Sequence, residues 1–347
     1  MLKALALTMV LRLALPPTAS FAASLNDEPD LIGERSIGYV LTGASWAIFQ
    51  SSDGSSECPE GFNAGPRERF AVLFPDGGSV EDTQLQRESH TRYPEDEVDS
   101  FPYRYAGGQI APGLDLDGRA DADDFRTSEG LAGIDNQLFR AIGCTRLFRA
   151  PDGTFAHFAN RWVREMSFNR VLIEVENLDS LANDDEVTVT IYRGKDPLVT
   201  DASGDKIIAG GSNRIDKRFS ARFHHVLKGR VHGGVLTTEP ADVVWPWAVF
   251  LARPGEFYIR GFRLQLDISA ASARGYIGGY ADVGSWYDQI ARSWSAHYAS
   301  YGDLYSPSLF AALRRLADGY PDAAGTMTAI SSAIAVEFSQ VFIDREN

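Results

Sequence analysis

Alternating apolar and polar residues in the middle of the chain constrain its fold more than any other feature. Apolar side chains recur at every second position in Val171–Val175, Val187–Ile191 and Phe262–Ile268. In the last two segments polar residues occupy the intervening positions, which is the pattern of strands with one buried face in an antiparallel sheet. Irregular loops separate these strands, as they do in two-sheet folds. We therefore predict a mainly β fold, an antiparallel β-sandwich or jelly roll, over residues 36–283.

The last part of the chain, residues 284–347, has a different periodicity. Apolar or aromatic residues recur every four positions from Trp286 to Trp294, and Ser306-Pro307 has the composition of a helix start. Apolar residues spaced by three and four continue over residues 326–343 and predict a final helix. We expect this segment to be a helical appendage that packs on the β domain.

The first residues have the composition of an export signal. Lys3 provides a positive charge, an apolar stretch follows, and the Ser-Phe-Ala sequence that ends at Ala22 is a small-x-small cleavage site. We predict a signal peptide at residues 1–22 and a flexible lead-in at 23–35, so that the mature protein is periplasmic or secreted. The alternative is a disordered N-terminal extension. No later stretch approaches the roughly 20 apolar residues of a membrane helix, so we expect no transmembrane segment in the mature chain.

The charge balance is strongly acidic. The formal net charge is -14, and removal of residues 1–22 takes away Lys3 and Arg12 and no acids, which gives -14 - 2 = -16. Neutralising phosphates needs clustered Lys and Arg, so this balance argues against binding to nucleic acid or to an anionic membrane.

The chain has two cysteines, Cys58 and Cys144. Two cysteines in an exported protein pair more often than they stay free, so we predict a disulfide bond between them. The loop that this bond would close is long, and in the chain-entropy model such a bond stabilises the fold by roughly 4–5 kcal/mol. Two buried thiols are the alternative.

An acidic segment lies between the two cysteines. Five aspartates occur within ten residues from Asp115 to Asp124, with Arg119 among them. This density of like charge favours a bound cation, and calcium accepts six to eight oxygen ligands in flexible geometry. The EF-hand pattern fails because Arg119 and Ala120 stand where it needs a ligand and a glycine. We predict a calcium site of another kind, whose candidate ligands are Asp115, Asp117, Asp121, Asp123, Asp135 and Asn136. The alternative is a solvated acidic loop in which Asp135 caps a short helix.

Aromatic residues supply a second group of candidates. Their rings can stack on sugar faces while a polar group at the edge stays free for hydrogen bonds. The candidate ligand-binding residues are Trp245, Trp247, Tyr280 and Trp286. The alternative is that these rings are core contacts between helices and sheet.

Motifs for covalent catalysis are lacking. The sequence contains no Gly-x-Ser-x-Gly elbow and no Gly-rich phosphate loop followed by lysine. A glycosidase needs only two carboxylates about 5–10 Å apart, and no acid pair stands out by its spacing. The catalytic residues of an enzyme of this kind therefore stay unassigned.

Several segments are similar to those of one group of proteins. Gly-Leu-Asp115-Leu-Asp117-Gly, followed by Gly133-Ile-Asp-Asn-Gln-Leu-Phe-Arg-Ala-Ile-Gly-Cys144, resembles a pattern in exported bacterial proteins of unassigned function. The segments Asn169–Glu176 and Gly234–Pro240 are similar to parts of the same group. The resemblance implies a secreted or periplasmic protein, and it carries over no activity and no catalytic residue.

Three hypotheses about function follow. The leading one is an exported, calcium-stabilised β-sandwich that binds a ligand, either a glycan or another envelope component. The second is a hydrolase of an extracellular polymer that uses a carboxylate pair. The third is a structural or assembly protein whose helical tail docks a partner.

Overall fold

The computed structural model describes residues 35–63, 76, 86–87, 90–91, 103–149, 153–204, 206–247, 255–291 and 306–345. The predicted signal peptide (1–22) and the lead-in up to residue 34 lie outside these ranges. All of the described residues belong to one unit, Ile32–Asn347.

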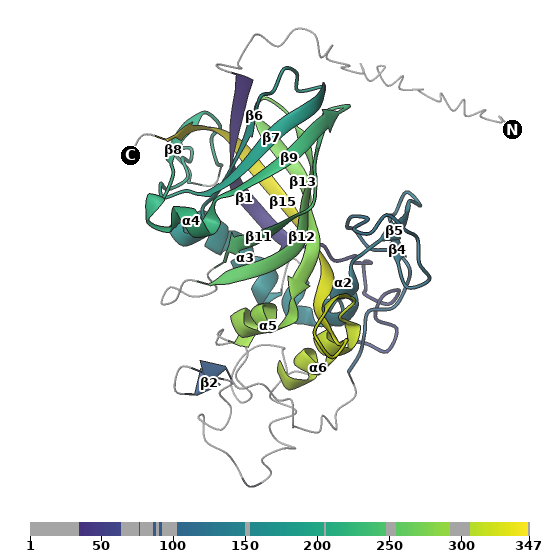
Figure 1. Ribbon diagram of the computed structural model, residues 1–347. Helices are drawn as coiled ribbons and strands as arrows, with labels where there is room; N and C mark the ends of the chain where they lie inside the picture. Colours follow the sequence, from purple (N-terminus) through teal and green to yellow (C-terminus); the bar gives the residue numbers. More distant parts are fainter. Residues whose placement is uncertain are drawn as a thin grey trace, which may run out of the picture. The chain divides into compact units, whose positions relative to one another are not determined.

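One large antiparallel sheet dominates the fold and closes on itself into a barrel (Figure 1). The closed path consists, in order, of β1 (Ser36–Trp46), β6 (Val171–Glu176), β7 (Asn183–Arg193), β9 (His225–His232), β10 (Val235–Thr238), β12 (Glu256–Ile268), β13 (Ser272–Asp282) and β15 (Met327–Asp344). Strand β15 pairs with β13 along one edge and with β1 along the other, which closes the path. The predicted antiparallel β class is confirmed. The predicted sandwich or jelly roll is not, because the sheet is continuous.

The remaining strands are short and lie outside this path. They are β8 (Gly211–Arg214), parallel to the end of β15, β11 (Ala241–Pro246) on β12, β14 (Gly319–Pro321) on β15, and the two small ladders β2 (Gln86–Arg87) with β3 (His90–Thr91) and β4 (Phe125–Arg126) with β5 (Ala132–Ile134). The β4–β5 ladder belongs to the loop region that carries the acidic segment, as Figure 1 shows.

Helices cover parts of the barrel. They are α2 (Gln137–Ile142), α3 (Thr154–Glu165), α4 (Ser220–Phe223), α5 (Val283–Ala291) and α6 (Ser306–Leu316), with 3-10 turns η3 (Arg146–Phe148), η4 (Ser167–Asn169) and η5 (Lys217–Phe219). Helix α3 packs on β1, and α2 packs between α6 and β15. The buried guanidinium of Arg170 donates to the carbonyls of Val163 and Arg164, which fixes the C-terminal end of α3.

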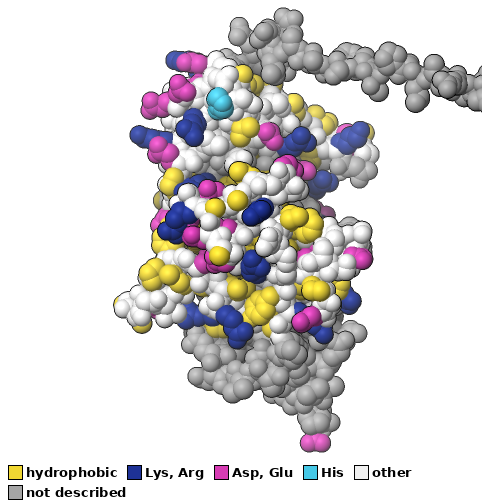
Figure 2. Space-filling model, turned by 90° about the vertical axis from the view of Figure 1, so that its right-hand side faces the viewer, with side chains coloured by type: hydrophobic (Ala, Val, Ile, Leu, Met, Phe, Trp, Pro, Cys, Tyr) yellow, Lys and Arg dark blue, Asp and Glu magenta, His cyan; other side chains and the backbone are white. Residues whose placement is uncertain are grey.

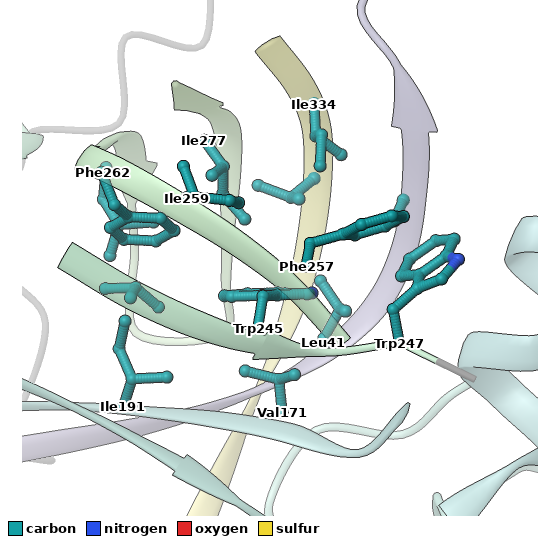
Figure 3. Close-up of a cluster of buried hydrophobic side chains, with 14 of the residues drawn as sticks. Leu41, Val171, Ile191, Trp245, Trp247, Phe257, Ile259, Phe262, Ile277 and Ile334 are labelled. Atoms are coloured by element: carbon teal, nitrogen blue, oxygen red, sulfur yellow. The ribbon is translucent and has the colours of Figure 1, made fainter. Parts of the chain in front are cut away.

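Large apolar side chains fill the barrel interior (Figure 3). Leu41, Val171, Ile191, Phe262 and Ile277 come from five strands and point toward one another. In β12 the buried side chains alternate with more exposed ones, as the sequence pattern predicts for a sheet with one buried face, whereas β1 and β6 are buried on both faces.

The prediction of a helix over residues 326–343 is wrong, because this segment is strand β15. Ile330, Ile334 and Phe338 are four residues apart. A spacing of four puts side chains on one face of a strand and also on one side of a helix, so it does not distinguish the two. Strand β15 lies between β1 and β13, so residues 284–347 are not an appendage but supply a central strand of the barrel. The expected helix start at Ser306 is confirmed by α6.

Charged groups of both signs are interspersed with apolar side chains on the face of the molecule in Figure 2. The excess of acidic residues therefore does not form one continuous patch on that face. Among the helices of the described chain, none combines the length and the apolar character that crossing a membrane requires.

Candidate metal centre

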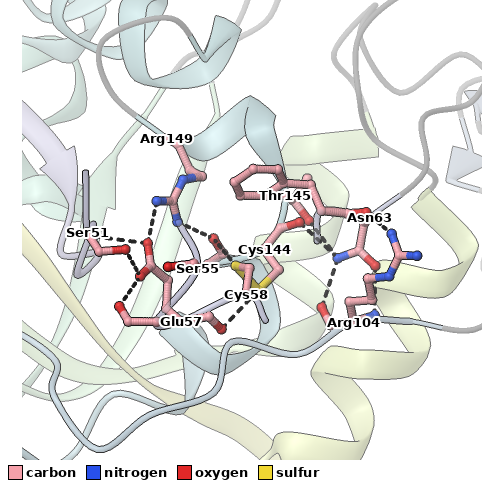
Figure 4. The surroundings of a disulfide bond; sticks show 12 residues. Ser51, Ser55, Glu57, Cys58, Asn63, Arg104, Cys144, Thr145 and Arg149 are labelled. Carbon is pink, nitrogen blue, oxygen red and sulfur yellow. Dashed lines mark hydrogen bonds and ion pairs between the residues drawn. A yellow bond between two sulfur atoms is a disulfide. The ribbon is translucent and has the colours of Figure 1, made fainter. Parts of the chain in front are cut away.

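A disulfide bond joins Cys58, in the loop after β1, to Cys144, just beyond α2 (Figure 4). The Cα atoms are 5.6 Å apart, and both residues are buried. The predicted pairing is confirmed. It ties together segments that are 86 residues apart and anchors the region that carries the acidic segment to the start of the barrel.

A buried carboxylate stabilises this connection. The side chain of Glu57 is 1 % exposed and accepts hydrogen bonds from the amide and the hydroxyl of Ser51 and from the hydroxyl of Ser56. Arg149 Nη2 lies 2.5 Å from Glu57 Oε1, and Figure 4 shows the ion pair beside the disulfide. Burial alone would raise the pKa of Glu57, but the bonds from Ser51, Ser56 and Arg149 outweigh it and lower the pKa to about 2.

The acidic segment begins on the outer face of the barrel. A Cβ at Gly278 of β13 would lie 2.8 Å from Leu114 Cδ1, so the absence of a side chain there lets the loop approach the sheet. Leu114 and Leu116 are buried, and Asp115 and Asp117 alternate with them toward solvent. Arg263 of β12 donates to the Asp115 carbonyl at 2.8 Å, which fixes the loop to the barrel.

A backbone bridge brings Asp135 to this loop. The amide of Asp135 donates to the Leu114 carbonyl at 2.9 Å, and Asp135 Oδ2 accepts from the Leu116 amide at 2.6 Å. Gly133 makes the approach possible, since its φ is +80° and a Cβ there would lie 2.4 Å from the Arg119 carbonyl. As a result, carboxylate oxygens of Asp115, Asp117 and Asp135 all lie within 4.8 Å of one another, a triad that could hold a metal ion.

The triad combines a buried acid with two exposed ones. Asp135 is 8 % exposed, and burial raises its pKa to about 7, with further contributions from the carboxylates of Asp124, Asp117 and Asp318. One cation partly offsets this charge: Arg119 donates to Asp117 Oδ2 through Nε at 2.9 Å and Nη2 at 2.6 Å. A bound cation would compete with Arg119 for that carboxylate.

Two of the other predicted ligands lie outside the triad. Asp121 is exposed, and its carboxylate lies 3.5 Å from Arg119 Nε. Asp123 holds α2 through its backbone carbonyl, which accepts from Gln137 and Arg140.

Asn136 has a structural role. Its Oδ1 accepts from the Phe139 amide at the start of α2, and its Nδ2 donates to the carbonyls of Ala47 and Pro112. The cap of this helix is therefore Asn136, and the alternative in which Asp135 caps it is wrong. The Asp135 carboxylate therefore does not cap the helix and lies near those of Asp115 and Asp117.

The tryptophans proposed for sugar stacking are buried. Trp245, Trp247 and Trp286 are 1 %, 4 % and 1 % exposed and belong to the main core cluster, where Trp46 contacts the last two. They cannot form an exposed platform, so the alternative of core contacts holds for these three residues. Tyr280 is half-buried, its ring lies 5.5 Å from that of Tyr320, and burial and the nearby Asp135 carboxylate raise its pKa.

One neighbour of the triad was not predicted. Asp318 lies between α6 and β14, accepts from the Ser331 amide at 2.7 Å, and contributes to the raised pKa of Asp135. In the sequence it is an acid just after a helix, far from the acidic segment. Only the pairing of β14 with β15 brings it near Asp135, so no local signal could have identified it.

The chain matches no protein-family model, no curated protein sequence and no solved structure.

Proposed function

We propose that this chain is an exported β-barrel binding protein that is stabilised by calcium at Asp115, Asp117 and Asp135. The observation that carries the proposal is the close approach of three carboxylates, within 4.8 Å of one another, around a buried aspartate. The disulfide supports a location outside the reducing cytoplasm, where such bonds persist.

The donor set favours calcium over other divalent ions. All three side chains offer carboxylate oxygens, which are hard ligands and do not select zinc or copper. Calcium tolerates irregular geometry and takes additional water ligands, which the exposed Asp115 and Asp117 leave room for. Magnesium demands near-octahedral geometry and loses water reluctantly. Burial is the main cause of the raised pKa of Asp135, and repulsion from nearby carboxylates adds to it; a calcium ion would relieve this repulsion.

Calcium titration of chelator-treated protein tests the proposal. We expect a calorimetric signal and a rise in Tm with millimolar calcium, and neither response in Asp135→Asn. Asp121→Asn, which removes an acid outside the triad, is the matched control and should respond like wild type. Absence of both responses in wild type, or equal responses in the two variants, would refute the calcium site.

A hydrolase is the second candidate, and one observation favours it. Retaining glycosidases place an acid of raised pKa about 5 Å from an ionised carboxylate. The pKa of Asp135 is raised to about 7, and the carboxylates of Asp115 and Asp117 lie within 4.8 Å. Polysaccharide cleavage that persists in chelator and disappears in Asp135→Asn would favour this candidate over the calcium site.

A further inference from the structure

A polar groove of about 450 Å³ lies on the outer face of the barrel, between α3 and strands β13 and β15. Its floor consists of small outward residues, among them Gly43, Ser45 and Ala335. Ser45 lies opposite Ala335 in the pairing of β1 with β15, whereas the adjacent pair, Ala44 and Val336, points into the core. The groove shares no residue with the acidic triad.

Three charged side chains cross the groove in register. Arg274 of β13 lies directly opposite Asp267 of β12 and Glu337 of β15. Side chains in such positions have Cβ atoms about 5 Å apart, so ion pairs are within reach. Nevertheless, all three are exposed, and within the described part of the chain none of these side chains forms an ion pair or a hydrogen bond. Their donors and acceptors are available to a ligand.

The end of the groove at β1 is shaped by a missing side chain. A Cβ at Gly43 would lie 3.2 Å from Glu337 Oε2 and 3.3 Å from Asn160 Oδ1, so the carboxylate and the amide come together over this glycine. The Ala44 amide donates to Asn160 Oδ1 at 2.9 Å, which fixes the orientation of the side chain and leaves its NH₂ group as a donor. Arg164, one turn further along α3, lines the same wall.

We infer that this groove binds an uncharged sugar ring of a glycan. Arg164 and Arg274 balance Asp267 and Glu337, so the lining has no net charge and favours a ligand without net charge. Guanidinium and carboxylate groups are planar and can each bond two neighbouring hydroxyls. Tyr276 adds a half-buried ring that offers an apolar face to the sugar. The inference rests on the proposed function only in treating the chain as a binding protein.

Saturation-transfer NMR and calorimetry with methyl glycosides of glucose, galactose and mannose test this inference. Methyl glucuronide, an anion, and a dipeptide, a zwitterion, are the charged probes. We expect at least one neutral glycoside to bind wild type, and its affinity to fall about tenfold or more in Glu337→Gln and in Arg274→Gln. Glu186→Gln on β7 and Arg230→Gln on β9 change exposed charges elsewhere on the barrel and should leave the affinity unchanged.

Ala335→Phe provides a test without a change of charge. The larger side chain would fill the floor of the groove and abolish binding, while an unchanged Tm would confirm that the barrel is intact. Absence of binding by all three neutral glycosides, equal affinity in wild type and the groove variants, or binding of the charged probes alone would each overturn the inference. Asp135→Asn should lose the calcium response and keep glycoside binding, so a failure of the groove and a failure of the calcium site are distinguishable.

Discussion

The ionised carboxylate of Glu57 should stabilise the fold, and this stabilisation should weaken as the pH falls and the carboxylate becomes protonated. Its carboxylate has a pKa of about 2 in the fold, against an ordinary value of 4.5. A carboxyl whose folded pKa is depressed stabilises the fold above its unfolded pKa and loses that contribution as the pH falls through the folded value. The difference of about 2.5 pKa units corresponds to about 3 kcal/mol at pH 7 and to roughly half of that at pH 3.

Urea unfolding of wild type and Glu57→Gln, with the disulfide intact, measures this contribution. The variant keeps the shape of the side chain but removes the negative charge beside Arg149, whose side chain is only 10 % exposed. We expect Glu57→Gln to be about 3 kcal/mol less stable at pH 7 and the gap to narrow to about 1.5 kcal/mol at pH 3. Glu60→Gln, three residues away and exposed, should match wild type at both pH values. An equal gap at pH 7 and pH 3 would refute the reasoning.

Three further predictions concern other parts of the molecule. The contribution of Asp135 to stability has the opposite pH dependence, because its pKa is raised from 3.8 to about 7. The free energy of unfolding of the metal-free protein should therefore fall by up to about 4 kcal/mol as the pH rises from 4 to 8. Asp135→Asn should remove this fall in urea unfolding with chelator. Asp216→Ala should cost about 3–5 kcal/mol, since Arg193, 4 % exposed and 2.5 Å from Asp216, would stay buried without its acid; a loss below 1 kcal/mol would contradict this. Replacing Cys58 and Cys144 by Ser should lower the free energy of unfolding by about 4–5 kcal/mol, measured against oxidised wild type, because the bond spans 86 residues.

Some features of this fold were predictable because one or two residues determine them. The two cysteines had only each other as partners, and they are paired. The Ser306-Pro307 pair predicted a helix start, since proline suits a first turn, and α6 begins at Ser306. Asp115 and Asp117 alternate with buried leucines in the way that their spacing implies. In each case either the physical cause acts within a few residues, or the composition leaves a single possibility, as it does for the two cysteines.

The composition of the acidic segment did not distinguish ligands from structural residues. Asp121 and Asp123 carry the same carboxylate as the triad, and Asn136 offers an amide oxygen. The Asp121 carboxylate contacts Arg119. The main-chain carbonyl of Asp123 accepts from the side chains of Gln137 and Arg140, and the Asn136 side chain caps α2. Which carboxylates converge depends on the bridge between Leu114 and Asp135, a contact across 21 positions. Likewise, Trp245 faces the barrel interior because of its register on β11, which composition does not reveal.

Closure of the barrel is the feature that the sequence pattern specifies least. Sandwiches and barrels share a period of two, and they differ only in which strands pair. Here the deciding pair is β1 with β15, from opposite ends of the described chain. At this seam a Cβ at Gly38 would lie 2.6 Å from the Val341 carbonyl, so the glycine permits the close approach of the two strands. From the sequence alone, this glycine would be expected only to weaken the strand that contains it. The role of Gly38 is seen only when β15 lies beside it. β15 is also the strand whose apolar residues, four positions apart, fit a helix equally well.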